Sequence, residues 1–139
     1  MTTADLPTSP NKAGRRALDT SWLAFLHQYG LSKYLKVIPT PPAGLELAIE
    51  EFNQRDYWQC HETLEGLWLP ERYPVRLFYH ALIKASVGLL HLRRHNKRGA
   101  TVKMQDAKYG LVPFLPGFMG VNTDRLHSDV LERLAYLHT

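Results

Sequence analysis

Three titratable side chains fall within five residues of one predicted helix, and they are the residues of this sequence best suited to chemistry. His61, Glu62 and Glu65 form the pattern H-E-x-x-E. On a helix, His61 and Glu65 are four residues apart and share a face, so one turn presents a base, an acid and potential metal ligands. The spacing predicts an acid/base pair in which His61 is the general base and Glu65 orients it.

The same pattern differs by one residue from the zinc-protease motif H-E-x-x-H. Because the missing second histidine is a metal ligand in that motif, a metal here would need a further ligand from another helix, for which His80 and His91 are the candidates. We predict no cofactor. If a divalent metal binds, the expected ligands are His61, Glu65 and His80.

A second set of polar residues follows one face of the long helix predicted after Pro74. His80, Lys84, His91 and Arg94 lie at offsets of 0, 4, 11 and 14 residues, close to whole turns, and form one polar stripe on an otherwise apolar helix. Burying such groups without partners would cost several kcal/mol. The stripe therefore either faces solvent with ordinary ion pairs or lines an interior cleft.

The cleft interpretation requires the helix that carries His61 to pack along this stripe. Glu62 or Glu65 would then meet Lys84, and His61 would face His80 or His91. Titratable groups that converge in this way mark a candidate site. We expect Trp58 and Trp68 to be core or cleft-wall residues, and the predicted ligand-binding residues are Tyr57, Glu62, Trp68, His80, Lys84 and His91.

Apolar residues at helical spacing predict the elements that must position these groups. We expect helices over about 17–29, 43–54, 57–68, 74–95, 98–111 and 123–137, with Gly30 ending the first and Asp56 capping the third. No alternation typical of β-strands is present. The fold class predicted is all-α, a compact bundle of about five to six helices built from helical hairpins around a long central helix.

The length of 139 residues indicates one domain. Residues 1–16 hold few apolar residues and are expected to form a mobile tail, which leaves 17–139 as a single helical domain. Cys60 is the only cysteine, so no internal disulfide forms, and we expect its thiol to be a small buried apolar group.

Composition limits the compartment and the partners. No apolar run approaches the roughly 20 residues that span a bilayer, and no secretory signal is present, so we expect a soluble, cytoplasmic protein with no membrane partner. The net charge is +4, and the basic run Arg93–Arg98 lacks interleaved aromatic residues. We therefore expect no nucleic-acid partner, but a small molecule or another protein. The oligomeric state is left open.

Several motifs follow one another along the chain: Phe52-Asn53 with Tyr57, His61-Glu62 with Glu65 and Trp68, Leu82-Ile83, His91-Leu92-Arg93-Arg94 with Asn96 and Gly99-Ala100, and Pro116 with Gly120. Over roughly residues 44 to 137 the sequence resembles the family catalogued as domain of unknown function 309. The resemblance implies an all-helical, uncharacterised domain. This chain departs from the family in carrying His80 and Lys84 where the family often has glutamines, and His95 where it often has glycine.

Three functions remain open from the sequence. The first is a polar cleft for a small ligand, centred on the H-E-x-x-E helix. The second is a helical protein-interaction module in which these residues are structural, and in which Phe114, Phe118 and Met119 of a loop contribute to an exposed apolar patch. The third is a metal-dependent, hydrolase-like enzyme.

Overall fold

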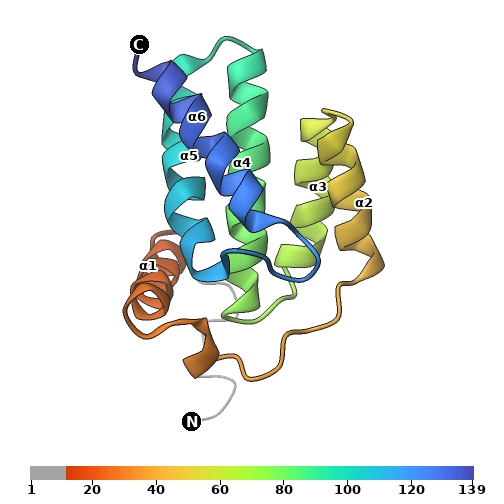
Figure 1. The fold of residues 1–139 in the computed structure, drawn as a ribbon, viewed down its shortest axis with the longest axis vertical. Coiled ribbons are helices and arrows are strands. Elements are labelled where there is room, and N and C mark those ends of the chain that lie inside the picture. Colours follow the sequence, from red (N-terminus) through yellow and green to blue (C-terminus); the bar gives the residue numbers. More distant parts are fainter. Residues whose placement is uncertain (1–11) are drawn as a thin grey trace.

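The structure is a computed structural model that describes residues 12–139. Over this range the chain forms six α-helices and two short 3-10 helices, without β-strands (Figure 1). In chain order they are α1 (Lys12–Tyr29), η2 (Leu31–Lys33), α2 (Ala43–Asn53), α3 (Tyr57–Trp68), α4 (Val75–Arg93), α5 (Lys97–Leu111), η3 (Val112–Phe114) and α6 (Thr123–Leu137). The all-α bundle expected from the sequence is confirmed.

Helix α4 is the centre of the bundle. The α2–α3 hairpin packs on one side of it and the α5–α6 pair on the other, while α1 crosses near one end (Figure 1). Eleven residues of α4 are buried, among them Leu77, Phe78 and Ala85. A helix that is apolar around most of its circumference requires neighbours on several sides, which explains its central place.

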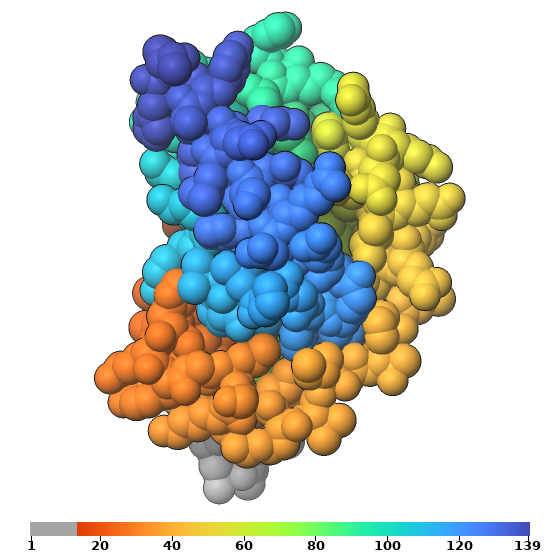
Figure 2. Space-filling view, in the orientation of Figure 1, coloured from red at the N-terminus to blue at the C-terminus, as the bar shows by residue number. Residues whose placement is uncertain are grey.

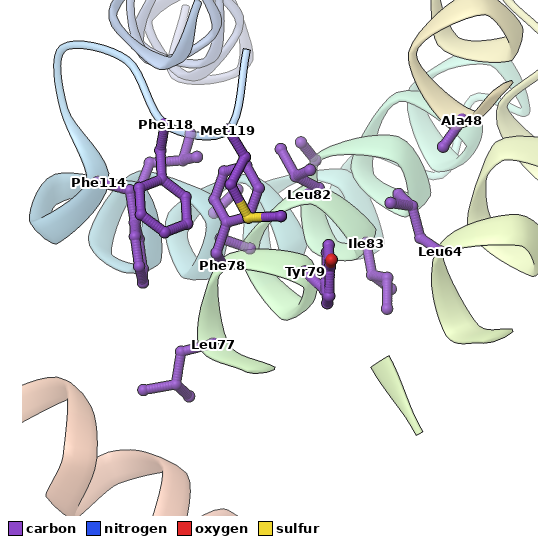
Figure 3. Close-up of a cluster of buried hydrophobic side chains, with 14 of the residues drawn as sticks. Ala48, Leu64, Leu77, Phe78, Tyr79, Leu82, Ile83, Phe114, Phe118 and Met119 are labelled. Atoms are coloured by element: carbon purple, nitrogen blue, oxygen red, sulfur yellow. The ribbon is translucent and has the colours of Figure 1, made fainter. Parts of the chain in front are cut away.

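The loop between α5 and α6 closes one end of the core. Phe114 and Phe118 pack against Phe78, with ring centroids 5.4 and 4.8 Å apart respectively (Figure 3). Phe114, Phe118 and Met119 are 1%, 4% and 6% exposed. The prediction that this loop contributes to an exposed apolar patch is therefore wrong, because its large side chains complete the core instead.

Several local predictions can be compared with the structure. Helix α1 begins at Lys12 rather than near Ala17, so residues 12–16 of the expected tail are helical, and residues 1–11 lie outside the described range. Cys60 is 1% exposed as expected, and burial raises the pKa of its thiol to about 12. Trp58 is 53% exposed and is not a core residue. Between residues 12 and 139, no helix has the length and apolar character needed to cross a membrane.

Candidate functional site

Helix α3 carries the H-E-x-x-E residues, and specific groups fix both of its ends. At the start, the Asp56 carboxylate accepts a hydrogen bond from the backbone N–H of Gln59. At the end, the Arg76 guanidinium donates to the carbonyl groups of Trp68 (2.8 Å) and Leu69 (3.0 Å) and lies 4.2 Å above the Trp68 ring. A cation at the carboxyl end of a helix also complements its dipole. Arg76 thus joins α3 to the first turn of α4.

His61 makes its closest polar contact within its own helix. Its Nε2 atom lies 3.1 Å from Glu65 Oε1, while its Nδ1 atom lies 3.9 Å from Glu62 Oε1. Nδ1 is buried and has no hydrogen-bond partner among the described residues. Glu65 is therefore placed to orient His61, as the spacing predicted. The nitrogen that would take a proton from a substrate is nevertheless closed off from solvent.

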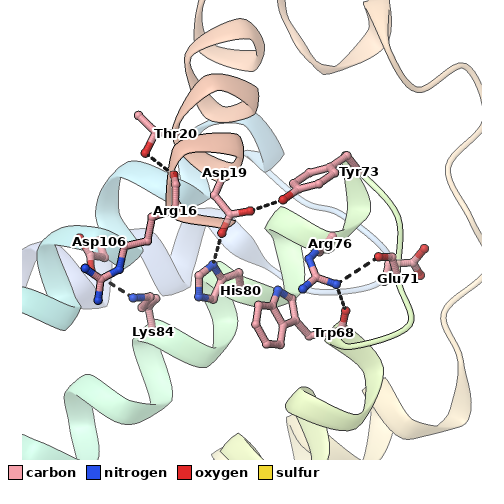
Figure 4. Close-up of polar contacts among 10 residues, drawn as sticks. All are labelled: Arg16, Asp19, Thr20, Trp68, Glu71, Tyr73, Arg76, His80, Lys84 and Asp106. Atoms are coloured by element: carbon pink, nitrogen blue, oxygen red, sulfur yellow. Dashed lines mark hydrogen bonds and ion pairs between the residues drawn. The ribbon is translucent and has the colours of Figure 1, made fainter. Parts of the chain in front are cut away.

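His80 on α4 lies among groups from α1, α3 and the loop that precedes α4 (Figure 4). Its ring stacks on Trp68 with centroids 5.1 Å apart, and its Nδ1 atom lies 3.6 Å from Asp19 Oδ2 of α1. The other oxygen of Asp19 accepts a hydrogen bond from the Tyr73 hydroxyl. The Trp68 ring and the Asp19 carboxylate therefore hold the position of this imidazole, and Tyr73 holds Asp19.

Burial is the main cause that lowers the pKa of His80 to about 4, and the cation Lys84 one turn further along α4 adds to it. Asp19 acts in the opposite direction. His80 is therefore neutral at pH 7, with one ring nitrogen as donor and the other as acceptor.

Lys84 lies 3.3 Å from Asp106 Oδ2 on α5, in an ion pair that crosses the α4–α5 interface. His80, Lys84 and Asp106 together line a cavity of about 480 Å³ between α1, α4 and α5, here called the α1–α4–α5 cavity. Its other polar or charged side chains are Arg16, Asp19, Thr20, Lys103 and Tyr109. A cavity of this size suits a small molecule.

The predicted site residues do not all lie in this cavity. His80 and Lys84 line it, and Trp68 packs directly against His80. His61, Glu62 and Glu65 are not among its lining residues. The remaining two predicted residues, Tyr57 and His91, also lie outside its lining and have separate contacts.

Tyr57 lies under the Arg93 guanidinium at 4.7 Å, and His91 Nδ1 lies 3.2 Å from the Asn96 side-chain amide at the start of α5.

Sequence reasoning missed the residues that α1 and α5 contribute. Arg16, Asp19 and Thr20 follow helical spacing on α1, and Lys103 and Asp106 do so on α5. This helical spacing is the feature of the sequence that could have identified these residues as polar faces of α1 and α5. It was overlooked because α1 was expected to begin after Arg16, and because nothing in the sequence indicates that α1 packs beside His80.

No group of three or more His, Cys, Asp or Glu side chains is arranged to hold a metal ion within the part of the chain that the structure describes. His61 and Glu65 are adjacent, but His80 does not join them in such a group. The geometry of the described residues therefore brings together only two of the three expected metal ligands, His61 and Glu65.

The sequence of the α2–α3 hairpin and of α4 can be compared with known families. Residues 45–102 match the model of the family described as Domain of unknown function (DUF309). This match confirms the resemblance to that family which the motifs from Phe52 to Ala100 indicated. It covers α3, α4 and most of α2, with the first part of α5, whereas the Pro116 to Gly120 motif lies beyond it.

One relative is the uncharacterized protein YpuF of Bacillus subtilis (strain 168). It is 38% identical to this chain over 61 residues, which are 43% of this chain and 35% of YpuF. The chain thus spans about a third of the length of this relative. No solved structure matches the chain.

Proposed function

We propose that this protein binds a small organic anion in the α1–α4–α5 cavity. The observation that carries the proposal is the convergence of cationic side chains from three helices, Arg16, Lys84 and Lys103, around the neutral imidazole of His80. Clefts lined by one predominant charge attract ligands of the opposite charge.

The charges of the cavity support an anion over a cation. The three cations outnumber the two carboxylates, Asp19 and Asp106, so the lining carries a net charge of +1 while His80 is neutral. Asp19 already accepts a hydrogen bond from the Tyr73 hydroxyl and faces His80, and Asp106 is paired with Lys84. Both carboxylates are therefore engaged by the protein.

The walls between these charges are apolar. Leu23, Leu77, Ala81 and Val102 line the same cavity, so a ligand with a short hydrocarbon part between its polar groups fits its chemistry. A small dicarboxylate or a phosphate ester has this character. The anionic group would lie near Lys84 and the carbon part against the apolar wall.

Binding fits His80 better than catalysis does. A general base works best when its pKa is near the working pH, and a pKa of about 4 makes the neutral imidazole a weak base at pH 7. With Nδ1 turned to Asp19, the other ring nitrogen is left to hydrogen-bond a ligand. We therefore assign His80 the role of a polar contact to the ligand, with its position fixed by the protein.

The centre of the ligand cleft then lies at His80 and not on the H-E-x-x-E helix. Trp68 links the two, because its ring forms the surface on which His80 stacks. His61, Glu62 and Glu65 lie outside the proposed ligand contacts, and Glu65 holds the orientation of His61 on α3. An enzyme that uses His61 would need Nδ1 to become accessible.

Amide chemical-shift mapping tests the proposal. Succinate and inorganic phosphate are titrated separately into the labelled full-length protein, which distinguishes a carboxylate site from a phosphate site. Saturable shifts at Thr20, His80, Lys84 and Lys103 with either anion support the site. The site is rejected if neither anion gives saturable shifts, or if the shifts are confined to α2 and α3.

A further inference from the structure

A second cavity lies on the opposite side of α4 from the first, between the α2–α3 hairpin and the amino-terminal end of α6. It has a volume of about 340 Å³, and its opening falls between the yellow α2–α3 surface and the blue α6 surface in Figure 2. We call it the α2–α6 cavity. None of its lining residues lines the α1–α4–α5 cavity, so the two are separate sites.

The depth of this cavity is apolar and already covered. Leu45, Ala48, Leu64 and Leu82 line it, yet each is at most 8% exposed. A docked protein segment gains most by covering exposed apolar side chains, and these walls offer little such surface. The shape therefore favours a small molecule that enters the cavity over a protein that lies across it.

The rim of the cavity is polar on the α6 side. Arg125 and Asp129 line the opening from successive turns of α6, and Asn122 lies at its start. The Arg125 side chain is exposed and makes no hydrogen bond or ion pair with a described residue, although Asp129 is one turn away. An Arg in the first turn also faces the positive end of its own helix dipole, which favours a nearby anion.

From this arrangement we propose that the α2–α6 cavity binds an amphipathic anion, such as a medium-chain carboxylate. The hydrocarbon chain lies against Ile49, Phe52 and Leu126, which line the cavity and are partly exposed, and the carboxylate lies at the rim where Arg125 donates to it. Guanidinium and carboxylate groups match in geometry and can form two parallel hydrogen bonds. Asp129 opposes this binding through its like charge.

The experiment compares octanoate with 1-octanol, which have the same chain length and differ in head-group charge. Both are titrated into the full-length protein, and affinity and amide shifts are measured. We expect octanoate to shift amides of α2, Leu64 and Leu126 and to bind more tightly than the alcohol, by about tenfold, since a charge-assisted hydrogen bond is replaced by a neutral one.

Two exposed positions test the head group without touching the core. Arg125→Gln should weaken octanoate binding by about tenfold and leave 1-octanol unchanged, whereas Asp129→Asn should strengthen octanoate binding. Equal affinity for acid and alcohol, or an Arg125→Gln variant that binds octanoate as the wild type does, overturns the proposal. So does an absence of binding. Self-association that shifts the same amides without ligand would assign the cavity to a second copy of the chain and also overturn it.

Discussion

Replacement of His80 by glutamine should change how the stability of the protein depends on pH. In the folded protein the pKa of His80 is lowered to about 4 from an ordinary value of 6.5, because the ring is buried against Trp68 and lies beside Lys84. Between these two values the unfolded chain binds a proton that the folded protein does not. Stability from this group is therefore fully present above pH 6.5 and is lost as the pH falls toward 4.

The size of the effect follows from the linkage relation. Each unit of pH within this window changes the free energy of unfolding by about 1.4 kcal/mol, so the loss from pH 7 to pH 5 reaches at most about 2 kcal/mol. The imidazole is 28% exposed, and solvent screening reduces the figure. We expect a loss of about 1 to 2 kcal/mol from His80.

Urea unfolding at pH 5, 6 and 7, followed by circular dichroism, measures this quantity for the wild type and for His80→Gln. The variant also loses the stacking of His80 on Trp68, but that cost is the same at each pH and only offsets the curve. His138→Gln is the matched control, because His138 is exposed at the end of α6. Wild type and His138→Gln should lose more stability at pH 5 than His80→Gln does. Parallel curves for all three proteins would refute the reasoning.

Three further changes test the packing that positions the site. Arg76→Met should lower the free energy of unfolding by about 2 to 3 kcal/mol, through loss of its hydrogen bonds to the α3 carbonyls and its cation–π contact, while Arg72→Met, at an exposed position, changes it little. Gly99→Ala should cost about 1 kcal/mol, because its Cβ would lie 2.7 Å from the Asn that caps α5, whereas Gly66→Ala, with no atom within 4 Å, should gain about 0.5 to 1 kcal/mol. His95→Gly should stabilise the protein by about 1 kcal/mol, because His95 has a φ of 58°. Thermal and urea unfolding measure all five variants.

Two comparisons complete these tests. Arg94→Gly is the control for His95, because Arg94 has a φ of −87° and gains nothing from glycine. If both glycine variants are equally destabilised, strain at His95 is not the cause. If Arg76→Met and Arg72→Met unfold at the same urea concentration, the attachment of α3 to α4 does not depend on Arg76.

The helices were predictable because short-range rules determine them. Asp56 caps α3 as its position predicted, α6 spans Thr123–Leu137 as the apolar spacing predicted, and Gly30 follows α1 with a φ of 85°. These features depend on a few neighbouring residues. The same rules placed His80 and Lys84 on one polar face of α4.

The site was only partly predictable because its other half comes from distant segments. Asp19 lies 61 residues before His80 in the chain, and Asp106 lies 22 residues after Lys84. Helical spacing gives the face of each helix but not which faces meet. Within a single helix, spacing alone is sufficient. It correctly predicted that His61 and Glu65 are neighbours, because they share one turn of α3.

The measurement that tests the central claim most directly is the affinity for succinate and for phosphate of three proteins, determined by isothermal titration calorimetry. They are the wild type, Lys84→Gln and Lys108→Gln, the last removing an equal charge from an exposed position on α5 outside the cavity. We predict saturable binding of at least one anion, weakened about tenfold by Lys84→Gln and unchanged by Lys108→Gln. Equal weakening by both substitutions, or no saturable binding to the wild type, would contradict the assignment of an anion site beside His80.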